Sequence, residues 1–317
     1  MDLSVVIPVY NEEESLGPLL QELRAALDGT GKSYEIVVVD DGSTDGTYPV
    51  LRQLYQRENH LTAVKLKRNF GQTAAVAAGF AQAKGDIIIA MDGDGQNDPK
   101  DIPAMLAKLE EGYDLVSGWR FPRQDPLWSR RVPSLIANAL ISWITGVRLH
   151  DYGCTLKALR RDIAKEVRLY GEMHRFLPAI AFERGARIAE MKVHHRPRRW
   201  GVSKYGLART FRVLLDLLTV KFLLSYATRP LHIFGLVGLA SGALGFLFAV
   251  YLTIEKIVYR TPIGGRPLLL LSILLIVIGF QFITMGLLGE MLARTYHESQ
   301  GKSIYAVKEI LDERKAL

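Results

Sequence analysis

Short apolar runs and helical segments alternate along the first hundred residues. The apolar runs are rich in Val and Ile and cover residues 3–9, 35–39, 62–66 and 86–91. A helical segment follows each run; between residues 12 and 27, for example, leucines recur at the spacing of one helix face. This alternation predicts a doubly wound, Rossmann-like α/β domain, in which helices cover both faces of a parallel sheet. Ligands of such sheets bind beyond the carboxyl ends of the strands.

Two stretches near the C-terminus, residues 231–254 and 267–289, contain no Asp, Glu, Lys or Arg. As helices, both are long enough to cross a hydrocarbon core of about 30 Å. We therefore predict two transmembrane helices; the alternative is a pair of buried core helices. Two crossings leave both flanks on one side of the membrane. Basic residues beside the spans favour the cytoplasm for that side, although the loop between the spans is basic as well (Arg209, Arg212, Lys221, Arg229, Arg294 and Lys302 against Lys256, Arg260 and Arg266).

These patterns divide the chain into four parts. They are a cytoplasmic α/β domain at 1–206, an amphipathic interfacial helix region at 207–230, a two-helix transmembrane domain at 231–289 and a cytoplasmic C-terminal tail at 290–317. The alternative for the second part is an ordinary helix packed on the sheet. The net charge is +7 and the basic residues concentrate between 120 and 229, which favours an anionic lipid surface or a phosphate ligand over nucleic acid.

The turn after the first apolar run reads Pro8-Val9-Tyr10-Asn11-Glu12. A dinucleotide site would need Gly-x-Gly-x-x-Gly at this position, so we do not expect a Rossmann dehydrogenase. The chain also lacks a Walker A loop, which argues against the common phosphate-loop NTPases. Its single cysteine excludes an internal disulfide and suits a reducing compartment.

Acidic side chains follow the ends of two predicted strands. Asp40 and Asp41 close the second apolar run, and Asp92 and Asp94 follow the fourth. Two carboxylates about 4 Å apart repel by on the order of 4 kcal/mol at an effective dielectric near 20, unless a cation lies between them. Oxygen ligands suit Mg²⁺ or Mn²⁺, which bridge carboxylates to substrate phosphates. An Asp-x-Asp alone is also typical of a solvated turn, but its place at a strand end beside Asp41 and Arg68 favours a metal–diphosphate site.

Five motifs and the two C-terminal spans resemble one known family. The motifs are "VVIPVYNEEESL", "VVVDDGSTDGT", "KRNFGQTAAVAAGF", "DGDGQNDP" and "HDYGCTLKALRRD". Over nearly its whole length the chain resembles the polyprenyl-phosphate glycosyltransferases of glycosyltransferase family 2. Within them it is most similar to the bacterial undecaprenyl-phosphate aminoarabinose transferases, and more distantly to dolichol-phosphate mannose synthases and bactoprenol glucosyl transferases. The resemblance implies a GT-A type fold and inverting, single-step transfer from a nucleotide sugar, with UDP favoured, to undecaprenyl phosphate at the inner membrane.

The resemblance also implies roles for individual residues. The donor nucleotide would be bound by Pro8, Tyr10, Glu12, Asp40, Asp41, Arg68 and Asp92. The ion, Mg²⁺ or Mn²⁺, would be held by Asp92, Asp94 and Gln96. Catalysis would rest on Asp94, through the charge of the leaving diphosphate, and on Asp151 as an acid near the sugar; the alternative for Asp151 is a cap before residues 156–162. The acceptor phosphate would be bound by Arg120, Arg130, Ser134, Arg198 and Lys204, and the alternative for the last two is a basic segment that meets lipid headgroups.

Two rival functions remain at this point. A processive polysaccharide synthase of the same superfamily would carry Gln-x-x-Arg-Trp, and the equivalent string here, residues 196–200, lacks the Gln. A catalytically inactive membrane adaptor would not need the intact acidic motif. Gly238 and Gly242 form Gly-x-x-x-Gly in the first span, which permits close helix packing. We expect a homo-oligomer, a tetramer by resemblance, with packing of the two spans of one chain against each other as the alternative use of these glycines.

Overall fold

The computed structural model describes residues 1–121, 138–139, 141–142, 145–167, 169, 173–197, 230–260, 262–299 and 304–312. The chain divides into two compact units, residues 1–220 together with 303–317, and residues 221–302. The interfacial helix region predicted at 207–230 lies outside the described residues, apart from Pro230.

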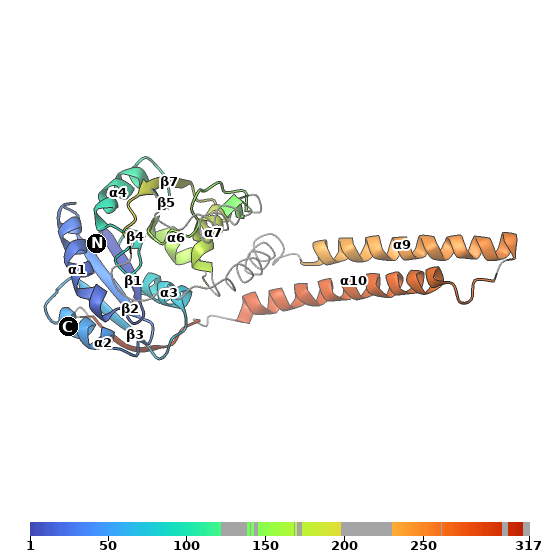
Figure 1. Ribbon diagram of the computed structural model, residues 1–317, viewed down its shortest axis with the longest axis horizontal. Coiled ribbons are helices and arrows are strands. Elements are labelled where there is room, and N and C mark those ends of the chain that lie inside the picture. Colours follow the sequence, from blue (N-terminus) through green and yellow to red (C-terminus); the bar gives the residue numbers. More distant parts are fainter. Residues whose placement is uncertain are drawn as a thin grey trace. The chain divides into compact units, whose positions relative to one another are not determined.

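Within the described residues, the first unit contains an eight-stranded sheet with the strand order β7-β5-β6-β4-β1-β2-β3-β8 (Figure 1). The strands are β1 (Leu3–Val9), β2 (Tyr34–Asp40), β3 (Leu61–Leu66), β4 (Ile87–Ala90), β5 (Leu115–Arg120), β6 (Lys157–Arg160), β7 (Ile188–Val193) and β8 (Val307–Leu311). The helices of this unit are α1 (Glu13–Asp28), α2 (Thr47–Tyr55), α3 (Gln72–Gln82), η1 (Pro99–Asp101), α4 (Ile102–Glu110), α6 (Arg161–Glu166), η3 (Met173–Phe176) and α7 (Leu177–Glu183).

The parallel centre of the sheet confirms the predicted alternation of strands and helices. β1 pairs in parallel with β2 and β4, so that Val6 lies opposite Val37 and Ala90. Helices cover both faces, which is why neighbouring side chains of β1 are buried on opposite sides. Val5 joins the core formed with α1 and α4. On the other face α3 lies so close that a Cβ at Gly79 would be 2.2 Å from Val6 Cγ1.

The sheet is mixed rather than fully parallel. β6 runs antiparallel to both of its neighbours, β4 and β5, and β7 pairs in parallel with β5. The alternative for Asp151, a cap before a helix at 156–162, is wrong, because Lys157–Arg160 is a strand and α6 begins only at Arg161. Two of the four β6 residues are charged, so the strand has no apolar run to mark it in the sequence.

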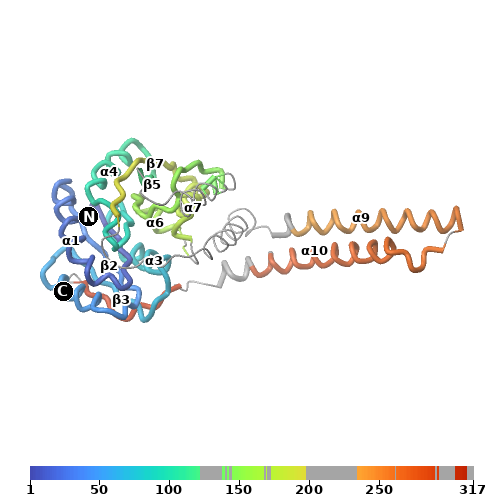
Figure 2. The backbone as a smooth tube through the Cα atoms, in the orientation of Figure 1, coloured from blue at the N-terminus to red at the C-terminus, as the bar shows by residue number. Residues whose placement is uncertain are grey.

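The C-terminal segment returns to the first unit. β8 pairs antiparallel with β3, and in Figure 2 its red trace runs beside the blue strand. Tyr48 donates a hydrogen bond to Glu309 (2.7 Å), and Lys84 pairs with the buried side chain of Asp312 (2.8 Å). Burial and Glu309 together raise the pKa of Tyr48. Residues 307–311, which we expected in a tail, are therefore part of the sheet.

The second unit is a hairpin of two long helices, α9 (Pro230–Tyr259) and α10 (Pro267–Ser299) (Figure 1). By length and composition, Phe234–Tyr259 and Pro267–Gly289 could each cross a membrane, in agreement with the predicted spans. Few of their side chains are buried, unlike those of a helix in a soluble core.

Glycines bring α9 and α10 into close contact. A Cβ at Gly238 would lie 2.6 Å from the carbonyl oxygen of Gly279, and a Cβ at Gly279 would lie 2.8 Å from the amide nitrogen of Gly242. The Gly-x-x-x-Gly motif thus packs the two helices of one chain together. The homo-oligomer stays a prediction.

Candidate active site

The acidic loop, residues 91–98, follows β4 at the carboxyl edge of the sheet. Asp92 is partly buried and both of its oxygens accept hydrogen bonds, Oδ1 from Gln72 Nε2 (2.7 Å) and Oδ2 from Thr155 Oγ1 (2.8 Å). Gln72 is the first residue of α3, and Thr155 lies just before β6. Both donors are neutral, so they orient this carboxylate without cancelling its charge.

The environment of Asp92 disfavours its ionised form. Burial and the nearby Asp94 raise its pKa to about 6, against the hydrogen bond from Thr155 and the positive charges of Lys157 and Arg120. A divalent cation beside Asp92 and Asp94 would reverse this effect, because it favours the ionised carboxylate.

The predicted metal ligands Asp92, Asp94 and Gln96 all lie on this loop. Asp94 is 6% exposed, and its Oδ1 accepts a hydrogen bond from the backbone N–H of Gln96 (3.1 Å). The part of the chain that the structure describes contains no cluster of three or more His, Cys, Asp or Glu suited to a metal. The loop fits an ion that takes two carboxylates and completes its shell with the Gln96 amide, substrate phosphates and water, as Mg²⁺ and Mn²⁺ do.

Neighbouring elements hold the acidic loop in place. Ser15 in α1 donates to the carbonyl oxygen of Gly93 (2.9 Å), and Asn97 donates to Thr155 Oγ1 (3.1 Å). Gly93 has no room for a side chain, because a Cβ there would lie 2.6 Å from Val9 Cγ1. The loop is thus fixed from β1, α1 and the start of β6.

The first predicted donor-binding turn lies beside this loop. Pro8 and Tyr10 are partly buried, and Pro8 lines a small cavity together with Asp92. Glu12 accepts a hydrogen bond from Ser15 Oγ (2.7 Å), the same hydroxyl that contacts Gly93. The turn and the acidic loop therefore share one point of attachment.

Asp40 and Asp41, at the end of β2, have different surroundings. Asp41 accepts the backbone N–H groups of Phe70 (2.8 Å) and Gly71 (2.9 Å), while burial raises its pKa. Asp40 is fully buried; its Oδ1 accepts the N–H of Ser43 (2.9 Å), but its Oδ2 has no hydrogen-bond partner among the described residues. Asp41 thus ties the start of α3 to β2, whereas Asp40 retains a buried acceptor that a ligand could satisfy.

Arg68 follows β3 and is exposed, with its guanidinium 4.5 Å from the centre of the Phe70 ring. The backbone of Arg68 lies close to the turn that follows Asp41, since a Cβ at Gly42 would be 2.4 Å from the Arg68 carbonyl carbon. Gly42 has φ of +70°, so both its conformation and its packing require glycine.

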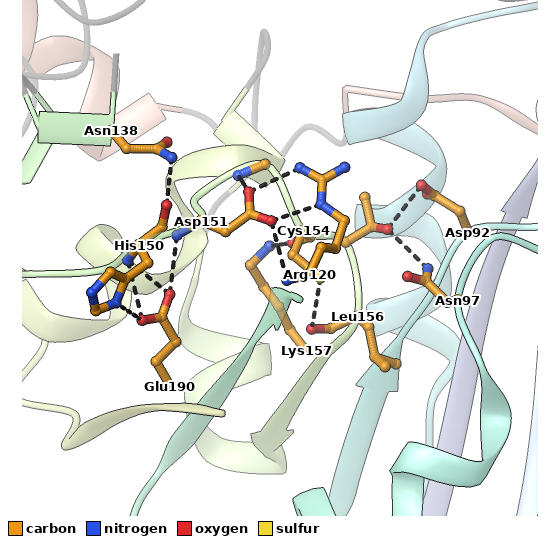
Figure 3. Close-up of polar contacts among 12 residues, drawn as sticks. Asp92, Asn97, Arg120, Asn138, His150, Asp151, Cys154, Leu156, Lys157 and Glu190 are labelled. Atoms are coloured by element: carbon orange, nitrogen blue, oxygen red, sulfur yellow. Dashed lines mark hydrogen bonds and ion pairs between the residues drawn. The ribbon is translucent and has the colours of Figure 1, made fainter. Parts of the chain in front are cut away.

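Arg120 and Asp151 form an ion pair on the other side of β4 (Figure 3). Arg120 Nε is 2.7 Å from Asp151 Oδ2 and its terminal nitrogen is 2.8 Å from Oδ1, a bidentate geometry, and Asp151 is 1% exposed. Asp151 also accepts the N–H of Gly153 (3.1 Å), and Glu190 in β7 accepts the N–H of Asp151 (3.0 Å). The geometry makes Asp151 the residue that orients Arg120; a direct catalytic role stays a prediction.

The other predicted acceptor-binding residues, Arg130, Ser134, Arg198 and Lys204, lie outside the described residues. Of the predicted acceptor set, the structure therefore places Arg120 alone.

Sequence reasoning missed several residues that contact this site. Gln72 and Thr155 bind Asp92, and Lys157 and His174 line the same cavity. Gln72 lies inside a motif already noted, so its position just after a strand was the available signal. For Lys157 the signal was absent, because a lysine in a short polar segment is normally exposed.

Known proteins share this architecture. Residues 4–168 match the family described as Glycosyl transferase family 2. The chain is 49% identical to the dodecaprenyl-phosphate galacturonate synthase of Rhizobium johnstonii, over 99% of this chain and 94% of that protein. It is 41% identical to the undecaprenyl-phosphate 4-deoxy-4-formamido-L-arabinose transferase of Shewanella sediminis, over 98% and 92%. The crystal structure of glucosyl-3-phosphoglycerate synthase from Mycobacterium tuberculosis, in complex with Mn²⁺ and uridine-diphosphate-glucose, has a TM-score of 0.55 at 22% identity over 69% of this chain and 78% of that chain. The likeness confirms the predicted GT-A type fold.

Proposed function

Since the chain belongs to glycosyl transferase family 2, we propose that its acidic loop holds the diphosphate of a UDP-sugar while a membrane polyprenyl phosphate attacks the sugar. The class of reaction follows from the relatives over the full length of the chain: it is inverting sugar transfer to a polyprenyl phosphate. One observation supports the donor site above all. Both oxygens of Asp92 accept hydrogen bonds from neutral groups, and a second carboxylate lies nearby.

The acidic loop and the end of β2 would bind different parts of the donor. Asp92, Asp94 and Gln96 would hold a divalent ion, Mg²⁺ or Mn²⁺, which supplies positive charge beside the departing diphosphate. The unpaired Oδ2 of Asp40 would accept the ring N–H of the uracil base. No strong general base is needed, because the attacking phosphate is already ionised at neutral pH.

Arg120 would bind the acceptor phosphate. A guanidinium matches phosphate oxygens in geometry and charge. Asp151 engages two of its nitrogens, which fixes the plane of the guanidinium. Asp151 would therefore act as a positioning residue.

The path of the chain supports two membrane crossings. α9 follows the first unit, and β8, after α10, is again a strand of that unit's sheet. A chain that leaves and re-enters one folded unit must cross a membrane an even number of times. We propose that this unit is cytoplasmic and that both helices span the inner membrane.

The test is transfer by the purified full-length protein in detergent, with undecaprenyl phosphate, Mn²⁺ and a panel of nucleotide sugars. We expect one sugar per lipid, and Asp94→Asn should lower the rate at least about 100-fold because it removes charge at the diphosphate. Asp86→Asn is the matched control, since Asp86 lies on the exposed surface before β4. A product that carries several sugars would support a processive synthase, and no transfer by any donor would support an adaptor.

A further inference from the structure

A small cavity lies beside Asp92, on the face of the sheet that α3 and α7 cover. Its polar lining comes from Gln72, Asp92, Thr155, Lys157 and His174, and the remaining walls are apolar. It has room for about one water molecule. Oxygen-sized groups can therefore enter it, but a whole sugar ring cannot.

Lys157 is the cation of this cavity. It is 2% exposed, and in β6 it lies opposite Ala90, the last residue of β4. Its Nζ donates to the carbonyl oxygen of Cys154, and Figure 3 shows its end next to that residue. An ammonium group has three donors. Within the described residues, Lys157 Nζ makes this one hydrogen bond and no other.

A buried ammonium with donors to spare is costly unless an anion compensates it. Burial lowers the pKa of Lys157, and the nearby carboxylates of Asp92 and Asp151 oppose this effect without forming an ion pair with it. Asp151 is already paired with Arg120. The start of α3 at Gln72 adds the positive end of a helix to the same cavity. Lys157 and the start of α3 thus present donors to the cavity, and within the described residues Asp92 lines it without accepting a hydrogen bond from Lys157.

We propose that Lys157 binds an anionic oxygen of the sugar nucleotide at the mouth of this cavity. The inference rests on the proposed function, because the donor supplies the anion. Two parts of a donor carry such an oxygen: the diphosphate, and the carboxylate of a sugar acid. Both would accept charge-assisted hydrogen bonds from the spare donors of Lys157.

The test measures binding rather than transfer. Calorimetry with Mn²⁺ would compare UDP, UDP-glucose and UDP-glucuronate on the full-length protein and on Lys157→Met, which keeps the length of the side chain and removes its charge. We expect binding of at least one of these ligands to weaken about 10- to 100-fold, the range for a hydrogen bond to a charged group. Lys157→Arg should restore most of that affinity.

Lys165→Met is the matched control. Lys165 in α6 is exposed and donates to the carbonyl oxygens of Phe80 (2.6 Å) and Ala81 (2.9 Å), so it caps the end of α3 away from the cavity. Its loss should lower the unfolding temperature and leave all three affinities within about twofold.

The possible outcomes distinguish the two sources of the anion from each other and from a failure of the inference. A loss confined to UDP-glucuronate assigns the sugar carboxylate, and an equal loss for all three ligands assigns the diphosphate. If Lys157→Met binds all three as wild type does, Lys157 is a structural counter-charge and the inference is overturned while the proposed function stands. If the wild type binds none of the three, the donor site itself is refuted.

Discussion

The two acids on either side of Lys157 differ in what their oxygens accept. Asp92, after β4, accepts hydrogen bonds from the neutral side chains of Gln72 and Thr155. Asp151, before β6, accepts two from the guanidinium of Arg120. Neutral donors orient a carboxylate and leave its charge in place, whereas a guanidinium largely cancels it. The loop after β4 is therefore suited to receive a cation, and the segment before β6 holds a cation that is already part of the chain.

The same contrast occurs on a smaller scale at the end of β2. Both oxygens of Asp41 accept backbone N–H groups at the start of α3, and one oxygen of the adjacent Asp40 has no partner among the described residues. One of these adjacent carboxylates is thus fully used in holding the fold, and the other retains a buried oxygen that no described residue satisfies. Both residues are aspartates, so the difference between them comes from their contacts and not from the residue type.

The largest expected effect is a difference in stability between Asp151→Asn and Asp92→Asn. Asp151→Asn leaves Arg120 without its counter-charge, and loss of one partner of a buried pair costs about 3–5 kcal/mol of unfolding free energy. Asp92→Asn removes a charge that burial disfavours, so it should cost less than about 1 kcal/mol and could stabilise the protein. Urea unfolding of the full-length variants in detergent, at pH 7 without metal, measures both.

Equal losses in the two variants would contradict this contrast, because they would show that Asp92 also has a cationic partner. The double variant Arg120→Gln with Asp151→Asn tests the ion pair more directly. With both charges of the pair removed, the unfolding free energy should recover part of the loss, since the guanidinium that lost its partner is gone.

The position of Asp40 and Asp92 at one edge of the sheet could be predicted from the sequence for a physical reason. The runs at 3–9, 35–39 and 86–91 are buried over most of their length, so they are largely apolar, and the acids that follow them mark the strand ends. Once the strands are parallel, their carboxyl ends share one edge, and Asp40 and Asp92 must lie near each other. Three short patterns therefore predict the place of the site.

The groups that tune those acids could not be predicted in the same way. Thr155 reaches Asp92 only because β6 turns back antiparallel between β4 and β5, and Lys157–Arg160 has no apolar pattern that announces a strand. The burial of Lys157 depends on that same register. The return of β8 to the sheet was equally hidden, because its partner β3 lies more than 200 residues away. Long-range antiparallel pairing leaves little trace in local periodicity.

An effect of intermediate size concerns pH. The folded pKa of Asp92, about 6, lies above its ordinary value of 3.8, so the folded protein holds this proton more tightly than the unfolded chain. Protonation of Asp92 therefore adds stability to the metal-free protein as pH falls from about 6 to about 4, and this contribution is lost as pH rises. Binding of a cation has the opposite dependence. The affinity for Mn²⁺ with UDP-glucose should fall about tenfold per pH unit below about 6.

Calorimetry at pH 5, 6 and 7 measures this dependence, and UDP-glucose is the suitable ligand because its diphosphate does not titrate in that range. Asp92→Asn provides the reference, since it has no carboxyl to protonate at this position. A wild type whose affinity changes no more than that of Asp92→Asn would show that Asp92 does not meet the cation.

The smallest expected effect tests whether the neutral donors orient Asp92. Thr155→Val keeps the shape of the side chain and removes the hydroxyl that donates to Asp92 (2.8 Å) and accepts from Asn97 (3.1 Å). A hydrogen bond to a charged carboxylate contributes about 1.5 kcal/mol at the low end of its range, and Gln72 still holds the other oxygen, so kcat/KM for the sugar nucleotide should fall about tenfold. KM for the lipid acceptor should stay unchanged, because Thr155 does not contact Arg120 in the structure.

Thr145→Val is the matched control for that change. The hydroxyl of Thr145 also has contacts, with the carbonyl oxygen of Ile141 (2.8 Å), the hydroxyl of Tyr152 (3.1 Å) and the N–H of Val147 (3.5 Å), but it lies away from the acidic loop. Both variants should lose a similar amount of unfolding free energy, and only Thr155→Val should lose activity with the donor. If the two variants keep the same kcat/KM, the hydroxyl of Thr155 only stabilises the fold, and the orientation of Asp92 must then rest on Gln72.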